Sequence, residues 1–268
     1  MADRLSLDAL LNEATGVGPV LGIDTCGPIA ILGVVTNGWV VAALRRHVAS
    51  HCSGLPAAVD DVLAAAKITL ADVLAVAVAL GPGSFTGLRI ALSYAKGIVA
   101  ASGRAIVGVS TLDAMALCAT PAKLPDGALV CPIIDARKDE VYGALYRVVT
   151  DTLEKISGDF VVNAKDLLPR ITSEVFLIGD SKAEEVSGLL RAEGRRAVVL
   201  EAAVLNQKGS TVAAVGAARV ARNEADAVAT LEPHYVRPSD ASVNFTVIKS
   251  GEINGTPRGR AHTAVRRA

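Results

Sequence analysis

The sequence predicts an α/β protein of two successive lobes, each with a mixed sheet of three antiparallel strands plus parallel strands and flanking helices. Three observations support this. Apolar residues make up 51% of the chain and fall in short Val- and Ala-rich runs, which are typical of buried strands and helices. Three strand-like runs come first, and strands and helices then alternate. The same order begins again after residue 120, although no sequence repeat is evident.

The first lobe is expected over residues 20–120, after an N-terminal extension of residues 1–19. Strand-like runs lie at 20–24, 29–35 and 39–44, and the turn formers Gly27-Pro28 and Asn37-Gly38 join them. This pattern predicts an antiparallel meander. Periodicity then predicts a helix at 55–66, a strand at 73–80, a helix at 90–101, a strand at 105–109 and a helix at 112–119. Ser110 and Asp113 form a capping-box-like start for the last helix.

The second lobe is expected over residues 121–223. Its predicted strands are 129–134, 141–149, 156–161, 175–178 and 197–200, and its predicted helices are 164–168, 182–193 and 210–223. The last helix is a candidate to pack back on the first lobe. Residues 224–268 form a C-terminal segment whose tail, from about residue 244, loses periodicity and gains Gly, Pro and Arg. We expect that tail to be disordered, and we favour a solvated end over an RNA-binding one.

Composition excludes several classes of protein. Lysine plus arginine and aspartate plus glutamate each number 27, so no net charge attracts nucleic acid or an anionic membrane. The N-terminus is acidic where a secretory signal needs a basic start, and no run approaches the roughly 18 apolar residues of a membrane span. The four cysteines, Cys26, Cys52, Cys118 and Cys131, form no C-x-x-C pair. We therefore expect a cytoplasmic protein with free thiols.

A glycine-rich junction, GPGSFTGLR at residues 81–89, joins a predicted strand to a predicted helix. Its spacing matches neither the dinucleotide fingerprint nor the P-loop. A tight turn with close helix packing is the favoured interpretation, and anion binding at the helix start is the alternative. Arg89 is poorly placed near the positive end of the helix dipole, so we expect a carboxylate, a phosphate or a partner to compensate its charge.

Two helices of the first lobe are more apolar than one buried face requires. On the first, Leu55, Val59, Val62 and Leu63 form a core stripe, while small residues fill much of the remaining surface. On the second, Ile90, Tyr94 and Ile98 lie on a different side from the residues that face the sheet. Either another part of this chain or a partner covers the additional apolar surface of these helices, and the pattern alone favours neither.

Several motifs together resemble the TsaB family, bacterial accessory proteins for threonylcarbamoyladenosine modification of tRNA. These are LGIDT (21–25), GPGSFTGLR (81–89), AKG (95–97), VGVSTLDAMA (107–116), IDARKDEVYGALY (134–146) and HYVRPSDA (234–241). They follow the family's order from about residue 21 to 241. The resemblance implies the fold of the actin-like ATPase superfamily, which has two RNase H-like lobes.

The resemblance also implies partners. Family members are understood to bind a catalytic TsaD-like subunit through the first two helices, and that complex transfers a threonylcarbamoyl group to N6 of adenosine 37 in tRNA. A TsaE-like ATPase is a further expected partner, and tRNA is met only through the complex. The implied partner-binding residues are Leu55, Val59, Val62, Leu63, Ile90, Tyr94 and Ile98. Self-pairing of the free chain through the same helices is a further expectation.

No catalytic or metal-binding residue is expected in this chain. The catalytic paralogue carries an H-x-x-x-H pair where Thr111 and Met115 stand here, and neither side chain suits a metal of this kind. Another such pair, His47 and His51, has no adjacent acidic ligand, so we discount it. The predicted function is a non-catalytic scaffold. The alternative is a free-standing ATP-dependent phosphotransferase or a metallopeptidase-like enzyme.

No tightly bound cofactor is expected, but weak binding of ATP or ADP with magnesium at a partner interface stays open. Active members of the superfamily handle magnesium phosphate at strand ends that correspond to Asp24 and Asp135. The candidates for weak nucleotide binding are Asp24, Thr25, Gly83, Ser84 and Arg89. For both aspartates a structural role as a hydrogen-bond acceptor is the favoured interpretation, since Pro28 after Asp24 offers no amide to a phosphate.

Overall fold

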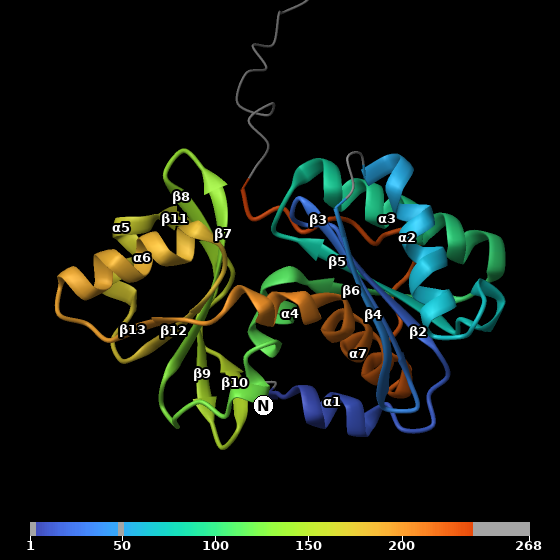
Figure 1. Cartoon of the computed structure of the whole chain (residues 1–268), viewed down its shortest axis with the longest axis horizontal. Coiled ribbons are helices and arrows are strands. Elements are labelled where there is room, and N and C mark those ends of the chain that lie inside the picture. Colours follow the sequence, from blue (N-terminus) through green and yellow to red (C-terminus); the bar gives the residue numbers. More distant parts are fainter. Residues whose placement is uncertain (1–3, 48–50, 238–268) are drawn as a thin grey trace, which may run out of the picture. The chain divides into compact units, whose positions relative to one another are not determined.

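Two mixed sheets flanked by helices make up this chain, whose structure is a computed structural model that describes residues 4–47 and 51–237 (Figure 1). The predicted α/β fold class is confirmed. The C-terminal tail expected from about residue 244 lies outside the described residues. Within residues 4–47 and 51–237, no helix is both long enough and apolar enough to cross a bilayer.

The first sheet follows the predicted order of strands. It contains β2 (Val20–Asp24), β3 (Ile29–Thr36), β4 (Trp39–His47), β5 (Ala75–Gly81) and β6 (Ala105–Ser110), arranged β4-β3-β2-β5-β6. The first three strands are antiparallel, and β5 and β6 extend the sheet in parallel to β2. The meander and the crossovers therefore match the sequence prediction.

Helices cover both faces of this sheet. On one face α2 (His51–Ala65) and α3 (Phe85–Ser102) share a core with Leu21 and Ile23, whereas on the other α7 (Lys208–Ala221) shares a core with Val20 and Val35 (Figure 1). This separation follows from the alternation of side chains along a strand. The helix α4 (Thr111–Leu117) starts at Ser110, whose Oγ accepts the Asp113 amide at 3.4 Å. The short α1 (Leu7–Glu13) packs against α7.

The start of α7 crosses the first sheet at unusually close range. Gly22 and Gly33 face each other on β2 and β3, and Gly209 of α7 lies over them. A Cβ added to Gly22 or to Gly33 would come within 2.5 Å of the backbone nitrogen of Ala213 or Ser210, respectively. Backbone therefore packs on backbone here, which only glycine permits.

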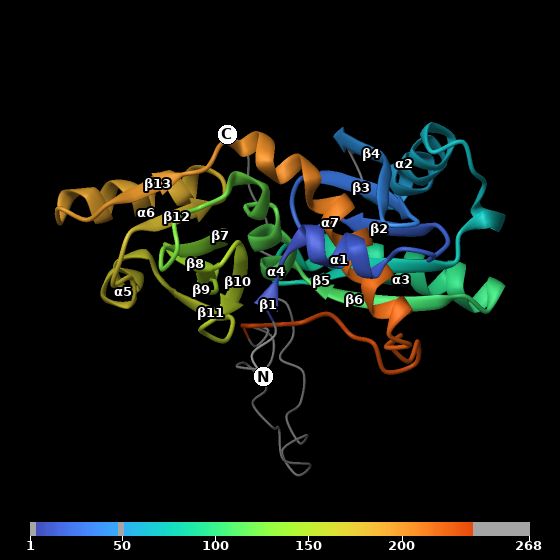
Figure 2. The same ribbon diagram turned by 90° about the horizontal axis from the view of Figure 1, so that it is seen from below.

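The second sheet is built around β7 (Leu129–Arg137). Its path is β1-β10-β9-β7-β12-β13, and β8 joins β7 to β11. The other strands are β1 (Arg4–Leu5), β8 (Glu140–Gly143), β9 (Tyr146–Val149), β10 (Thr152–Lys155), β11 (Phe160–Asn163), β12 (Val175–Ile178) and β13 (Ala197–Val199). β1 adds to the edge beside β10 (Figure 2). The remaining elements are the helices α5 (Ala164–Leu167) and α6 (Ser181–Ala192) and the 3-10 turns η1 (Leu70–Asp72), η2 (Thr120–Ala122), η3 (Leu168–Arg170) and η4 (Ala202–Gln207).

Two strand predictions for the second lobe are wrong in detail. The single strand expected at 141–149 is two strands, because Pro132 of β7 has no amide to donate where the ladder would continue opposite Ala144. The strand expected at 156–161 is replaced by β10 and β11. β10 forms a hairpin with β9 through Thr150 and Asp151, whose φ values of 48° and 60° give a turn that usually takes Asn-Gly.

Candidate functional site

The glycine-rich junction folds against the turn that follows β2. Ser84 caps α3, with its Oγ accepting the Gly87 amide at 3.3 Å and its own amide donating to the Cys26 carbonyl at 2.8 Å. A Cβ on Gly87 would overlap the Thr25 carbonyl, and one on Gly83 would lie 2.7 Å from the Cys26 Cβ. The junction is thus a tight turn with close helix packing. The β2–β3 turn of this chain fills the space beside Gly83, whereas Ser84 is exposed.

Asp24 and Thr25 are buried within that turn. Asp24 is 0% exposed, its Oδ1 accepts the Cys26 amide at 2.9 Å, and its Oδ2 lies 3.4 Å from Nζ of Lys208. The Thr25 hydroxyl donates to the Gly87 carbonyl at 2.8 Å. Both side chains therefore have partners inside the protein.

A cavity of about 250 Å³ lies beside this turn, and we call it the apolar cavity. Its lining residues are Cys26, Gly27, Pro28, Ile29, Ile31, Arg45, Met115, Ile133, Ile134, Gly179, Asp180, Leu205, Asn206 and Lys208. Most of these are apolar. A magnesium nucleotide needs amides and cations around its phosphates and a free carboxylate for the metal. The lining includes the cations Lys208 and Arg45 and the carboxylate of Asp180, but Lys208 pairs with Asp24, and Asp180 Oδ1 accepts the Lys182 amide at 3.0 Å. Because most of the remaining wall is apolar, these residues do not fit that cofactor.

Asp135 lies exposed on β7, where its Oδ1 accepts the Arg137 amide at 2.8 Å. This contact closes a local turn. In the part of the chain that the structure describes, no three His, Cys, Asp or Glu side chains come together as a metal site would require. The side chain of His51 lies outside that part, so the pair with His47 is not described.

Aromatic rings hold the guanidinium of Arg89. Its Cζ lies 3.8 Å from the centre of the Phe85 ring, and its Nε donates to the Tyr235 hydroxyl at 2.9 Å. Phe85 and Tyr235 lie 5.4 Å apart, centre to centre, and both are exposed. The sequence interpretation of Arg89 missed this arrangement. The spacing of four between Phe85 and Arg89 was a usable signal, but Tyr235 is distant in sequence.

A polar network links three of the sequence motifs. The Tyr146 hydroxyl donates to Asp113 Oδ1 at 2.5 Å, and Lys155 Nζ donates to the same oxygen at 2.8 Å. Lys155 also pairs with Asp159 at 2.7 Å, and Asp159 lies 3.3 Å from Nε2 of His234. Burial, and then the Asp113 carboxylate, raise the pKa of Tyr146 far above its usual range. This network joins α4 and β9 to the C-terminal segment, so these motif residues have a structural role.

Five of the seven residues assigned to a partner surface lie in this chain's own core. Leu55, Val59, Val62, Leu63 and Ile98 are at most 9% exposed and pack with the first sheet. This burial agrees with the core stripe expected of the four α2 residues, and it does not favour the assignment of the five residues to a partner surface. The physical reason is that α2 and α3 pack side by side on one sheet, so each helix buries one flank on the strands and another on its neighbour.

A narrower surface remains open along the two helices. Ile90 and Tyr94 are half-buried, and a Cβ on exposed Gly97 would meet nothing within 4 Å. The helices α2 and α3 contact each other, and Tyr94 packs against the core that both helices share. Burial, and then the charge of Asp60 on α2, raise the pKa of Tyr94. We define the α2–α3 face as Ala57, Asp60 and Ala64 of α2 with Ile90, Tyr94 and Gly97 of α3.

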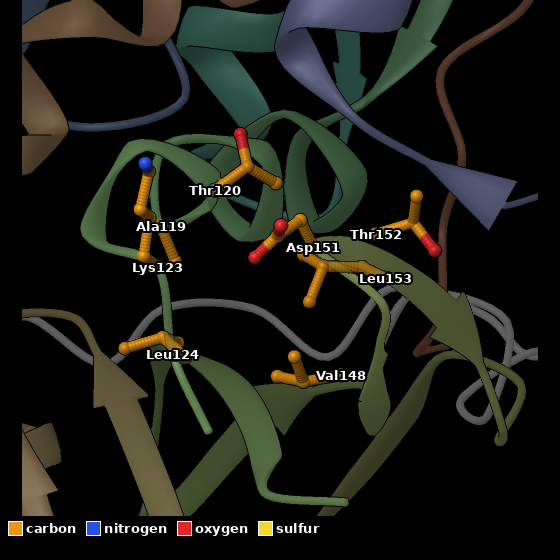
Figure 3. A pocket seen from close by; sticks show the side chains of 8 residues that line it. All are labelled: Ala119, Thr120, Lys123, Leu124, Val148, Asp151, Thr152 and Leu153. Atoms are coloured by element: carbon orange, nitrogen blue, oxygen red, sulfur yellow. The ribbon is translucent and has the colours of Figure 1, made fainter. Parts of the chain in front are cut away.

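A second hollow lies between the η2 turn with its flanking residues and the β9–β10 hairpin (Figure 3). Its volume of about 10 Å³ gives room for about one water molecule. The side chains around it are those of Ala119, Thr120, Lys123, Leu124, Val148, Asp151, Thr152 and Leu153. It is too small for an organic ligand.

Comparison with known proteins identifies the family. A family model described as "TsaD: tRNA N6-adenosine threonylcarbamoyltransferase" matches residues 45–245. The tRNA threonylcarbamoyladenosine biosynthesis protein TsaB of Escherichia coli is 36% identical over 162 residues, which cover 53% of this chain and 69% of that protein. The chain belongs to the TsaB family. The TsaB protein of Bacillus subtilis is 27% identical over 230 residues, covering 84% and 97% of the two chains.

A solved structure supports the TsaB assignment at the level of the fold. The structure of YeaZ from Pseudomonas aeruginosa aligns with this chain with a TM-score of 0.66 and 25% sequence identity. The alignment covers 82% of this chain and 100% of the YeaZ chain. In this chain, Thr111 and Met115 are 0% and 2% exposed. The Thr111 hydroxyl accepts the Gly81 amide at 3.1 Å and lies 2.9 Å from the Cys26 sulfur. Both residues are thus parts of the core.

The buried thiols of this chain are expected to resist alkylation. Burial raises the pKa of Cys118 and of Cys131 from 9.0 to about 12, and burial followed by the Asp24 charge raises that of Cys26. Iodoacetamide at pH 8, with mass-spectrometric mapping, should label these three sites only after unfolding. The thiol pKa values of Cys118 and Cys131 are higher in the folded chain than in the unfolded chain. The contribution of these buried neutral thiols to folding stability is therefore complete below pH 9 and is lost as the pH rises toward 12. Rapid labelling of the native chain at these sites would contradict this burial.

Proposed function

We propose that this chain is a non-catalytic scaffold subunit in the formation of N6-threonylcarbamoyladenosine at position 37 of tRNA. Its membership of the TsaB family, whose E. coli member is named for this biosynthesis, carries the proposal. The chain binds a TsaD-like catalytic subunit in the cytoplasm and stabilises the active arrangement of that subunit. A TsaE-like ATPase joins the complex, and tRNA is contacted through the complex.

The α2–α3 face is the proposed docking surface. Ile90 and Tyr94 offer partly buried apolar contact, and Gly97 leaves room for a helix of the partner to approach. Tyrosine is among the residues that most often dominate binding energy at interfaces. The Phe85, Arg89 and Tyr235 cluster lies at the start of the same helix α3, so it is available to extend the contact.

The burial of Thr111 and Met115 supports a non-catalytic role. In the catalytic paralogue these positions carry the two histidines of an H-x-x-x-H pair. Here both side chains are packed in the interior, and the Thr111 hydroxyl is committed to the glycine-rich junction. The chemistry is therefore assigned to the partner subunit.

Reconstitution of tRNA modification tests this function. Purified TsaD-like and TsaE-like subunits of the same host, threonylcarbamoyl-adenylate and unmodified tRNA are expected to give modified nucleoside only when this chain is added. The modified nucleoside is measured by mass spectrometry after digestion of the tRNA. The isolated chain, assayed for ATP hydrolysis, serves as the control for a free-standing enzyme. Equal modification without this chain, or ATP turnover by the chain alone, would contradict the proposal.

A further inference from the structure

A buried ion pair lies beside the apolar cavity. Asp24, at the end of β2, is 0% exposed, and the side chain of Lys208, at the start of α7, is 11% exposed. The distance of 3.4 Å between Lys208 Nζ and Asp24 Oδ2 is that of an ion pair, and Oδ2 has no hydrogen-bond partner among the described residues. Lys208 also lines the cavity. The two charges therefore meet where the cavity adjoins the strand end.

A carboxylate buried this deeply requires a neighbouring cation. An isolated charge in a protein interior carries a large desolvation penalty, and only a close opposite charge offsets it. Burial lowers the pKa of Lys208, but the neighbouring Asp24 carboxylate more than offsets this, so that pKa lies above its usual value. The side chain is thus a charged ammonium at neutral pH. Residue 208 supplies the positive charge that Asp24 needs.

We infer that the Lys208 ammonium occupies the cation position beside Asp24, so that the apolar cavity of this chain loads neither a divalent metal nor a metal-bound nucleotide. A carboxylate at the end of the first strand could otherwise hold magnesium through water. Here Oδ2 of Asp24 lies 3.4 Å from the Lys208 ammonium, and the Asp180 carboxylate of the lining accepts the Lys182 amide at the start of α6. Most of the remaining wall consists of apolar side chains such as Ile29, Ile133 and Leu205. This inference does not depend on the proposed scaffold function.

Thermal unfolding of two lysine variants tests the inference. Lys208→Ala removes the charge and leaves space, whereas Lys208→Met removes the charge and keeps most of the volume. Both should melt below the wild type by roughly 6 to 20 °C, since each leaves a buried carboxylate uncompensated. Millimolar Mn²⁺ should raise the melting temperature of Lys208→Ala by about 5 to 10 °C, and that of Lys208→Met and the wild type by less than 1 °C or so.

A double variant separates the charge from packing. Asp24→Asn combined with Lys208→Met removes both charges at similar volume, so it should recover most of the lost melting temperature and show no response to Mn²⁺. If Lys208→Ala does not fold, Asp24→Asn with Lys208→Ala should fold. The inference is overturned if neither double variant recovers, if Mn²⁺ does not rescue a folded Lys208→Ala, or if Mn²⁺ or Mg-ADP stabilises the wild type but not its Asp24→Asn variant.

Discussion

Gly22→Ala is expected to destabilise the chain by about 3 kcal/mol or more, which corresponds to a melting temperature roughly 6 to 12 °C lower. The new methyl group would lie 2.5 Å from the Ala213 nitrogen and would overlap the Gly209 carbonyl. Both contacts are backbone atoms of α7, so no side-chain rotation relieves them. α7 must move off the sheet and give up part of its core. Chemical denaturation followed by circular dichroism measures the change.

Gly188→Ala is the matched control for Gly22→Ala. Gly188 lies exposed in α6, and a Cβ there meets nothing within 4 Å. Alanine favours a helix over glycine, so this variant should be as stable as the wild type or up to about 1 kcal/mol more stable. An equal loss of stability in both variants would mean that α7 does not cross the sheet as closely as described.

Tyr94→Asp is expected to weaken association with the TsaD-like subunit by at least about 30-fold while the chain stays folded. Tyr94 is half-buried at the centre of the α2–α3 face, next to Asp60. An aspartate would place a second negative charge beside Asp60 and would be desolvated when the partner docks, at a cost typical of an unpaired interface charge. Isothermal titration calorimetry of the two subunits measures the affinity.

Leu189→Asp provides the control for Tyr94→Asp. Leu189 is also half-buried and packs at the edge of a core, but it lies on α6 of the second sheet. The Leu189→Asp variant should lose about as much stability as Tyr94→Asp, whereas its affinity for the TsaD-like subunit should stay at the wild-type level. If Tyr94→Asp unfolds the chain, Tyr94 belongs to the internal core and the docking face is misassigned.

The first sheet was predictable because its local signals agree with its tertiary pairing. Gly27-Pro28 and Asn37-Gly38 mark the turns, and the apolar runs beside them start at the residues where the observed strands start, although β4 continues past its apolar run to His47. In the second sheet the signals conflict. Pro132 lies inside a strand, and the β9–β10 turn uses Thr150 and Asp151 rather than Asn-Gly. A proline inside a strand and a turn without Asn-Gly cannot be predicted from these local signals. The predicted strand boundaries were therefore wrong.

The candidate site was less predictable than the fold, because an apolar helical stripe does not reveal what covers it. Val59 and Ile98 have the same character whether a partner or the chain's own core packs on them, and the structure shows the core. The ion pair of Asp24 with Lys208 and the contact of Arg89 with Tyr235 join residues distant in sequence. Neither is visible without the fold that brings these segments together.

Hydrogen–deuterium exchange of this chain, alone and with the TsaD-like subunit, tests the scaffold account most directly. The account predicts that the partner slows amide exchange in peptides covering residues 54–66 and 85–102, and leaves α6 unchanged. Protection confined to the second sheet and its helices, or no protection anywhere at concentrations that support tRNA modification, would contradict it.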